Sequence, residues 1–112
     1  MVNGLRGEVA FKVDDADYTL VYSTNAICEL EERLDKGLNV IVANMERLTT
    51  VRALLWAGLR AKHPDVTIQM AGEMIDRCGM ASATEAIGKA LTAAFPPADG
   101  AASKNGQTQK RG

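Results

Sequence analysis

The 112-residue sequence has few histidines and cysteines, the residues that most often hold zinc in proteins. It contains one histidine, His63, and two cysteines, Cys28 and Cys78, which lie far apart in the chain. A common zinc site needs several such ligands at close spacing, so we predict no metal site. The phosphate-binding motifs GxxxxGK[ST] and GxGxxG are also absent, and we predict no cofactor. An enzyme is therefore the weakest interpretation of the chain.

Long apolar runs are absent as well. No segment reaches the ~18 consecutive apolar residues that a membrane span needs. Residues 1–10 also lack the apolar stretch of a secretion signal. Both cysteines fall within helical patterns, on sides that we expect to face the core, where thiols are usually unreactive. We therefore predict a cytosolic protein with reduced cysteines and no membrane partner.

An excess of positive charge is the third feature that the chain lacks. Its formal net charge is −1. The residues after Pro96 carry three cations against one anion, which leaves the rest of the chain near −3. A mildly acidic body is atypical of a surface that binds nucleic acid.

Residues 49–79 nevertheless fit two helices joined by a turn near Pro64, and helix–turn–helix proteins read DNA with such a pair. The second of these helices offers Arg77 as its one cation, against Glu73 and Asp76. A recognition helix needs several donors for phosphates and bases. A DNA-binding regulator is therefore an alternative that the charge pattern disfavours, and we predict no specific nucleic-acid partner.

The densest apolar pattern lies in residues 49–63, TTVRALLWAGLRAKH, which contain the only tryptophan. The spacing predicts an amphipathic helix that begins at a Thr49 or Thr50 cap and ends before Pro64. Its apolar side chains are Val51, Leu54, Leu55, Trp56 and Leu59. A helix this apolar needs neighbours on most sides, so we expect the fold to surround it. Trp56 is predicted to be a core residue, with an exposed partner-binding anchor as the alternative.

Before this stretch, residues 5–13 and 18–22 alternate apolar and polar side chains on either side of the polar turn 14–17. This pattern predicts an antiparallel hairpin, whose apolar face must pack on helices or on another subunit. A helix follows, from Ser23 or Thr24 to a stop at Gly37. Residues 38–47 suit a strand or a short helix. We favour a helix whose buried side chains are Leu38, Ile41, Val42 and Met45.

After Pro64, a helix capped by Thr67 and ended by Gly79 carries Met70 and Met74 near the edge of its apolar face. Ser82 and Glu85 have the spacing of a capping box that opens a last helix, which Pro96 stops. Residues 98–112 contain no large apolar side chain, and we predict a disordered tail there. The expected organisation is one domain, residues 1–97, followed by the tail 98–112. The fold class is α+β: an N-terminal antiparallel hairpin packed on four or five short helices.

Three segments carry a resemblance to a known family: YTLVYSTNAICELEERLDKGL (18–38), LTTVRALLWAGLRAKHPDVTIQMAGEMIDRCG (48–79) and ATEAIGKALTAAFP (83–96). The chain resembles the small tail assembly chaperones of long-tailed phages and gene transfer agents. The resemblance implies a non-enzymatic protein that holds the tape-measure protein soluble while tail tube subunits polymerise around it. It also implies a place in the host cytoplasm during assembly and absence from the finished particle.

The partners implied by the resemblance are the tape-measure protein and the tail tube protein, and we consider a homo-oligomer as a further possibility. Trp56, Met70 and Met74 are the candidate partner-binding residues, because methionine adapts to irregular surfaces and tryptophan is enriched at interfaces. The rival interpretation is a structural component of the tail tube. A tube subunit usually builds its ring from a large β-sheet, whereas this chain predicts two strands. We therefore favour the chaperone.

Overall fold

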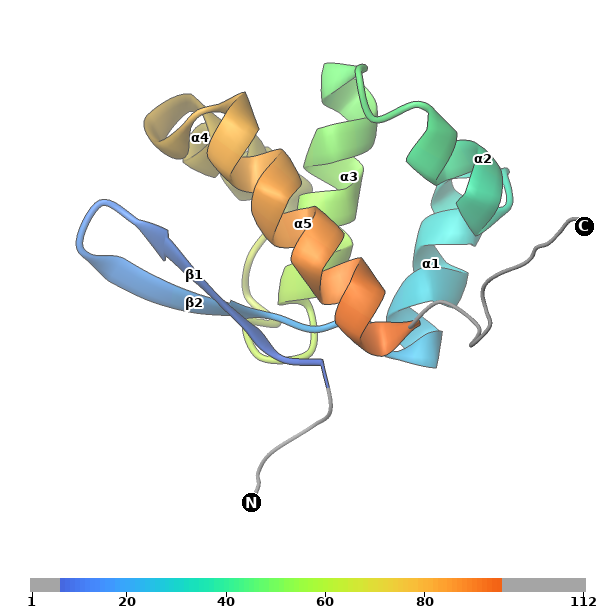
Figure 1. The fold of residues 1–112 in the computed structure, drawn as a ribbon, viewed down its shortest axis with the longest axis horizontal. Helices are drawn as coiled ribbons and strands as arrows, with labels where there is room; N and C mark the ends of the chain where they lie inside the picture. The colour runs from blue at the N-terminus through green and yellow to red at the C-terminus, as the bar shows by residue number, and fades with distance from the viewer. Residues whose placement is uncertain (1–6, 96–112) are drawn as a thin grey trace, which may run out of the picture.

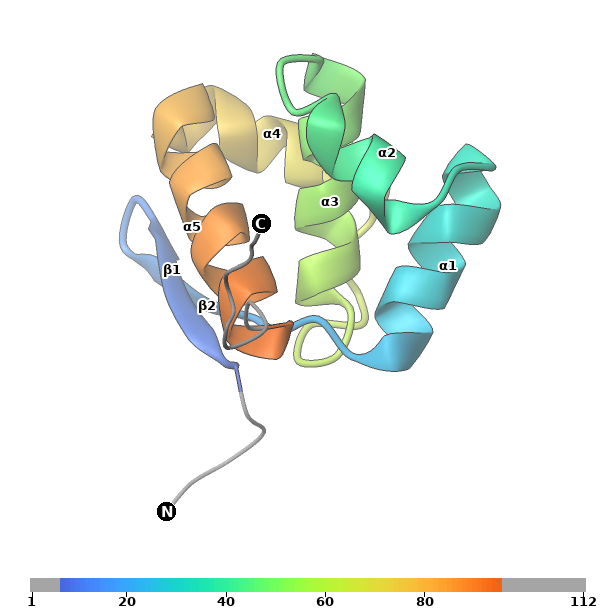
Figure 2. The same cartoon turned by 45° about the vertical axis from the view of Figure 1, so that its right-hand side comes forward.

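The computed structural model describes residues 7–95, which form a two-stranded sheet and five helices (Figures 1 and 2). The elements are β1 (Val9–Val13), β2 (Ala16–Leu20), α1 (Thr24–Leu34), α2 (Leu38–Ala43), α3 (Leu48–Leu59), α4 (Ile68–Cys78) and α5 (Met80–Ala94). The predicted fold class, a hairpin packed on a bundle of short helices, is confirmed. The predicted tail and the boundary at residue 97 lie outside the described residues.

The hairpin is antiparallel, with Phe11 of β1 opposite Tyr18 of β2. Phe11 and Val13 are buried against the helices, as the alternation predicted. The second strand, however, begins at Ala16 and not at residue 18, and it ends at Leu20 and not at residue 22. Asp14 adopts a left-handed conformation with φ of 54°, which aspartate tolerates better than most residues. A tight turn therefore closes at Asp14 and Asp15, and pairing starts earlier than predicted.

Helix α3 lies at the centre of the fold and packs on α1, α4, α5 and β2. Nine of its residues are buried, from Thr50 to Leu59 with Arg52 exposed. The predicted threonine caps are wrong: α3 begins at Leu48, and its N-cap residue, Arg47, makes no side-chain bond. Thr50 is itself only 8% exposed. The helix therefore starts without a side-chain cap, and its predicted end at residue 63 is also too late, because α3 ends at Leu59.

Tyr22 connects the segment after β2 to α3 through a hydrogen bond. Its hydroxyl donates a hydrogen bond to the Leu54 carbonyl, and burial raises the pKa of the phenol far above its ordinary value. A Cβ atom on Gly58 would lie 2.9 Å from Cζ of Tyr22. The absence of a side chain at Gly58 therefore allows the tyrosine ring to lie against the helix.

His63 connects the hairpin to the segment that follows α3. Its Nε2 accepts a hydrogen bond from the Thr19 backbone N–H at 3.0 Å, and its ring meets Tyr18 edge-on at 5.1 Å. The histidine therefore connects two elements that are distant in sequence.

The boundaries of α4 agree with the prediction: the Thr67 hydroxyl accepts the Met70 N–H at 3.0 Å, and Gly79 ends the helix with φ of 90°. The predicted capping box at Ser82 and Glu85 is wrong. Helix α5 begins at Met80, directly after Gly79, and has no side-chain cap. The left-handed glycine turns the chain so sharply that the next helix starts at once, and Ser82 falls inside its first turn.

Helix α1 begins as predicted, with the Ser23 side chain accepting the Ala26 N–H at 3.1 Å. It ends before the predicted stop at Gly37, because Asp35 takes the left-handed position with φ of 55°. Gly37 then precedes α2 and offers no side chain to cap it. The Glu31 carboxylate supplies the missing acceptor and receives the Leu38 N–H at 2.8 Å.

Helix α2 is short and packs mainly on α1. Ile41 is buried, as predicted, and Leu38 and Met45 are partly buried. Val42 was predicted to be buried but is 40% exposed. A helix that packs mainly on one neighbour buries one side only, so the β-branched run 40–42 presents valines on both sides of Ile41 to the surface.

Candidate protein-binding surface

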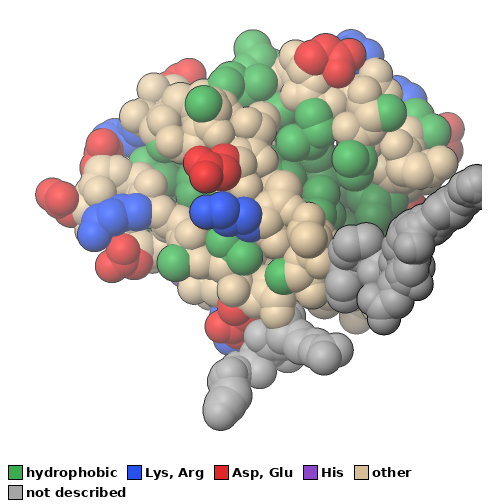
Figure 3. Space-filling view, viewed as in Figure 1, with side chains coloured by type: hydrophobic (Ala, Val, Ile, Leu, Met, Phe, Trp, Pro, Cys, Tyr) green, Lys and Arg blue, Asp and Glu red, His purple; other side chains and the backbone are tan. Residues whose placement is uncertain are grey.

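An apolar groove opens between α2 and α5. Its lining residues are Leu38, Asn39, Val42, Leu91, Thr92 and Phe95. Figure 3 shows a hollow lined with hydrophobic side chains beside α5, on the side that faces α2 in Figure 1. Val42 and Phe95 are 40% and 46% exposed in it. Among residues 7–95, no charged side chain lines the groove, so its chemistry suits another apolar surface better than an ion or a polar metabolite.

The local sequence explains both walls of this groove. Leu91 and Phe95 are four residues apart at the C-terminal end of α5, a spacing that places them on one face. On the other wall, α2 exposes Val42 because it packs mainly on α1. The two walls are distant in sequence, so this groove was not predicted. Two features of the sequence could have indicated the groove: the spacing of Leu91 and Phe95, and the valines on either side of Ile41.

The structure places Trp56, the first predicted partner-binding residue, in the core with 8% of its surface exposed. The guanidinium carbons of Arg33 and Arg60 each lie 5.0 Å from the centre of its ring. Arg60 also forms an ion pair with Glu29 at 3.5 Å. The tryptophan is thus shielded by two arginines at the packing of α1 on α3, and its part in partner binding stays a prediction.

Met70 and Met74, the other predicted residues, line a second pocket beside the hairpin turn, together with Asp14, Tyr18 and Arg77. Met70 is 40% exposed, whereas Met74 is 6% exposed and belongs to the core. This pocket shares no residue with the α2–α5 groove. The structure therefore brings the two methionines together but separates them from the larger apolar surface.

Arg77 is the cation on which a DNA-recognition helix would depend. It donates a hydrogen bond to Asp14 Oδ2 at 2.8 Å, and this bond and the carboxylate charge raise the pKa of Arg77. The contact joins α4 to the turn of the hairpin. A guanidinium held by a carboxylate is poorly placed to contact phosphate, which weakens the helix–turn–helix alternative further.

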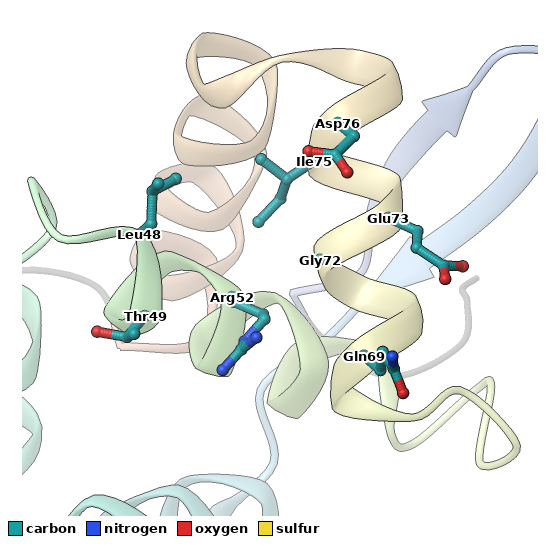
Figure 4. A pocket seen from close by; sticks show the side chains of 8 residues that line it. All are labelled: Leu48, Thr49, Arg52, Gln69, Gly72, Glu73, Ile75 and Asp76. Atoms are coloured by element: carbon teal, nitrogen blue, oxygen red, sulfur yellow. The ribbon is translucent and has the colours of Figure 1, made fainter.

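A third pocket lies between α3 and α4, beside the exposed Leu48 (Figure 4). Arg52 from α3 lies across Gly72 of α4, where an added Cβ would come 3.2 Å from Cδ of Arg52. Glu73 points away from α3 in this view, so the charged groups that line the pocket do not converge. Within residues 7–95, no three histidine, cysteine, aspartate or glutamate side chains gather in a way that could hold a metal.

The two cysteines differ in their surroundings. Cys28 is exposed on α1, so the prediction that it faces the core is wrong. Only one side of α1 packs on the bundle, and Cys28 lies beside that buried stripe, not in it. Cys78 is partly buried, and burial raises the pKa of its thiol. Among the described helices, none combines the length and the hydropathy that crossing a membrane requires.

Comparison with known proteins adds one finding. A protein-family model described as "Phage tail tube protein, GTA-gp10" matches residues 6–96, which is most of the chain. No curated protein and no solved structure matches the sequence. The description names a structural protein of phage tails and not an enzyme. It supports the tail tube alternative better than the assembly chaperone that the sequence favoured.

Proposed function

The chain belongs to the family of phage tail tube proteins described as GTA-gp10, and on that premise we propose that it is a structural tail protein that binds another tail protein through the α2–α5 groove. The family match is the observation that carries this proposal. It spans residues 6–96 and therefore includes the hairpin and all five helices.

The groove suits the apolar face of a helix from another tail protein. Its walls are two helices, and its lining is apolar apart from Asn39 and Thr92, which are uncharged. An amphipathic helix binds such a groove through apolar side chains spaced three and four residues apart. The tail tube protein and the tape-measure protein are the partners that we propose, during assembly in the host cytoplasm.

An assembly chaperone is the second candidate. One observation favours it: the described residues hold a single two-stranded sheet, whereas a ring of tube subunits usually needs a larger one. A chaperone would bind the tape-measure protein by the same groove and leave before the tail is complete. The two candidates therefore share a surface and differ in where the protein is at the end of assembly.

Quantitative mass spectrometry of purified tails separates these candidates. A tail component should be present in a fixed ratio to the tube subunit, in tails washed at high salt. A chaperone should be abundant in the assembling cells, bound to the tape-measure protein, and missing from the washed tails. The first result supports the leading proposal, and the second replaces it with the chaperone. Binding to neither tail protein would contradict both.

A further inference from the structure

The two edges of the hairpin differ. The edge of β2 is covered by the region around the end of α3: the Thr19 N–H donates to His63 Nε2 at 3.0 Å, and the Val21 N–H donates to the Gly58 carbonyl at 2.9 Å. In an antiparallel ladder, the N–H and C=O of one residue point to the same side. The backbone groups of Thr19 therefore point away from β1, toward that covering segment.

Within residues 7–95, the outer edge of β1 is open at Ala10 and Lys12. The register pairs Ala10 with Thr19 and Lys12 with Asp17. Because Thr19 points away from β1, these are the non-hydrogen-bonded pairs of the ladder, and the backbone groups of Ala10 and Lys12 point away from β2. Within residues 7–95 these N–H and C=O groups have no hydrogen-bond partner. Such an edge is a template for the addition of another strand.

The side chains along this edge are complementary to their own copy. Glu8, Ala10 and Lys12 share the face of the sheet that points away from the helices. If two β1 strands pair antiparallel around an axis at Ala10, Glu8 of each copy lies opposite Lys12 of the other. Opposite charges directly across a strand pair are favourable. Glu8 already pairs with Lys62 at 3.0 Å and makes a further contact, and Lys12 pairs with Asp17 at 3.6 Å. A carboxylate accepts several donors at once, so the pairs across the axis can form beside these contacts.

We propose that two copies of the chain pair through the outer edges of β1 and form a continuous four-stranded antiparallel sheet with a two-fold axis at Ala10. Head-to-tail pairing of β1 with β2 is blocked, because the edge of β2 is already covered. The symmetric arrangement uses the same edge twice and therefore stops at a dimer. This inference rests on the hairpin and is independent of the proposed role in the tail.

A charge exchange on the full chain tests the pairing, with sedimentation velocity as the readout. In a dimer of either variant, Glu8→Lys or Lys12→Glu, residues 8 and 12 of the two copies carry like charges. In a mixed dimer of the two variants, each of these positions faces the opposite charge. The wild-type chain should be dimeric at about 200 µM. Each variant alone should dimerise at least ~10-fold more weakly, and the mixture should recover the dimer. Lys36→Glu makes the same change of charge away from β1 and should leave the dimer intact.

Ala10→Pro supplies a second, independent variant. Its N–H is not used within the chain, and proline is tolerated at edge strands, so the hairpin should persist by circular dichroism. The substitution removes a central hydrogen bond of the proposed pairing and should abolish the dimer. If Ala10→Pro fails to fold, the charge exchange decides. A wild-type chain that is monomeric at about 200 µM, or a mixture that associates no better than either variant alone, overturns the proposal.

Discussion

Helices α2 and α3 are consecutive in the chain, yet they differ in how much of their surface is buried. Helix α3 has nine buried residues, whereas α2 has one, Ile41. Both segments are rich in apolar side chains, so hydrophobicity alone does not separate them. The number of neighbours does: α3 packs on four elements and α2 mainly on α1. The difference indicates that α3 determines whether the chain folds, while α2 leaves apolar surface available for a partner.

Trp56→Ala tests the α3 side of this comparison and should have the largest effect. Removing a ring that is 8% exposed should destabilise the protein by about 3–5 kcal/mol. Thermal and denaturant unfolding measure the change. An unchanged melting temperature together with lost binding of a tail protein would move Trp56 from the core to an interface.

Gly58→Ala should reverse the usual effect of replacing a helical glycine. The added Cβ would lie 2.9 Å from the Tyr22 ring, so we expect a loss of about 1–3 kcal/mol from overpacking. Gly88→Ala in α5 is the matched control, because nothing lies within 4 Å of its added Cβ. That change should stabilise the protein by about 0.5–1 kcal/mol. Equal responses at the two glycines would show that α3 is packed less tightly than described.

Thr67→Ala and Ser82→Ala compare a cap that forms with one that does not. The Thr67 hydroxyl accepts the Met70 N–H, and its loss should cost about 1 kcal/mol. Ser82 lies within the first turn of α5 and caps nothing, so its replacement should change the free energy of unfolding by less than about 0.5 kcal/mol. A larger cost at Ser82 than at Thr67 would restore the predicted capping box.

Val42→Ser tests the α2 side and should have the smallest effect on stability. Val42 is 40% exposed, so its replacement should change the free energy of unfolding by no more than about 0.5 kcal/mol. Denaturant unfolding beside Ile41→Ser, which alters a buried neighbour in the same helix, makes the contrast direct. Similar losses at positions 41 and 42 would show that α2 is buried on both sides.

The sequence predicts the parts of this fold that depend on local chemistry. The hairpin alternation, the Ser23 and Thr67 caps and the Gly79 stop all rest on neighbouring residues, and the structure confirms them. The end of α1 depends on a left-handed aspartate, and the exposure of Val42 depends on tertiary packing. A local pattern carries little of that information.

The candidate groove illustrates the same limit. Trp56, Met70 and Met74 were selected by residue type, but the structure places Trp56 apart from the two methionines and buries both Trp56 and Met74. The groove joins Val42 to Leu91 and Phe95, from helices far apart in sequence. Only the arrangement of α2 and α5 in space brings these side chains together.

The most direct measurement of the central claim compares two glutamate substitutions at equally exposed positions. Val42 lies in the α2–α5 groove and Met70 lies in the pocket beside the hairpin, and each is 40% exposed. Affinities of Val42→Glu, Met70→Glu and the wild-type chain for the purified tape-measure and tail tube proteins can be measured by calorimetry, with circular dichroism as the check on folding. The account predicts that Val42→Glu folds but binds at least ~10-fold more weakly, and that Met70→Glu binds like the wild type. Normal binding by Val42→Glu with loss of binding by Met70→Glu would contradict it and assign the partner to the methionine pocket.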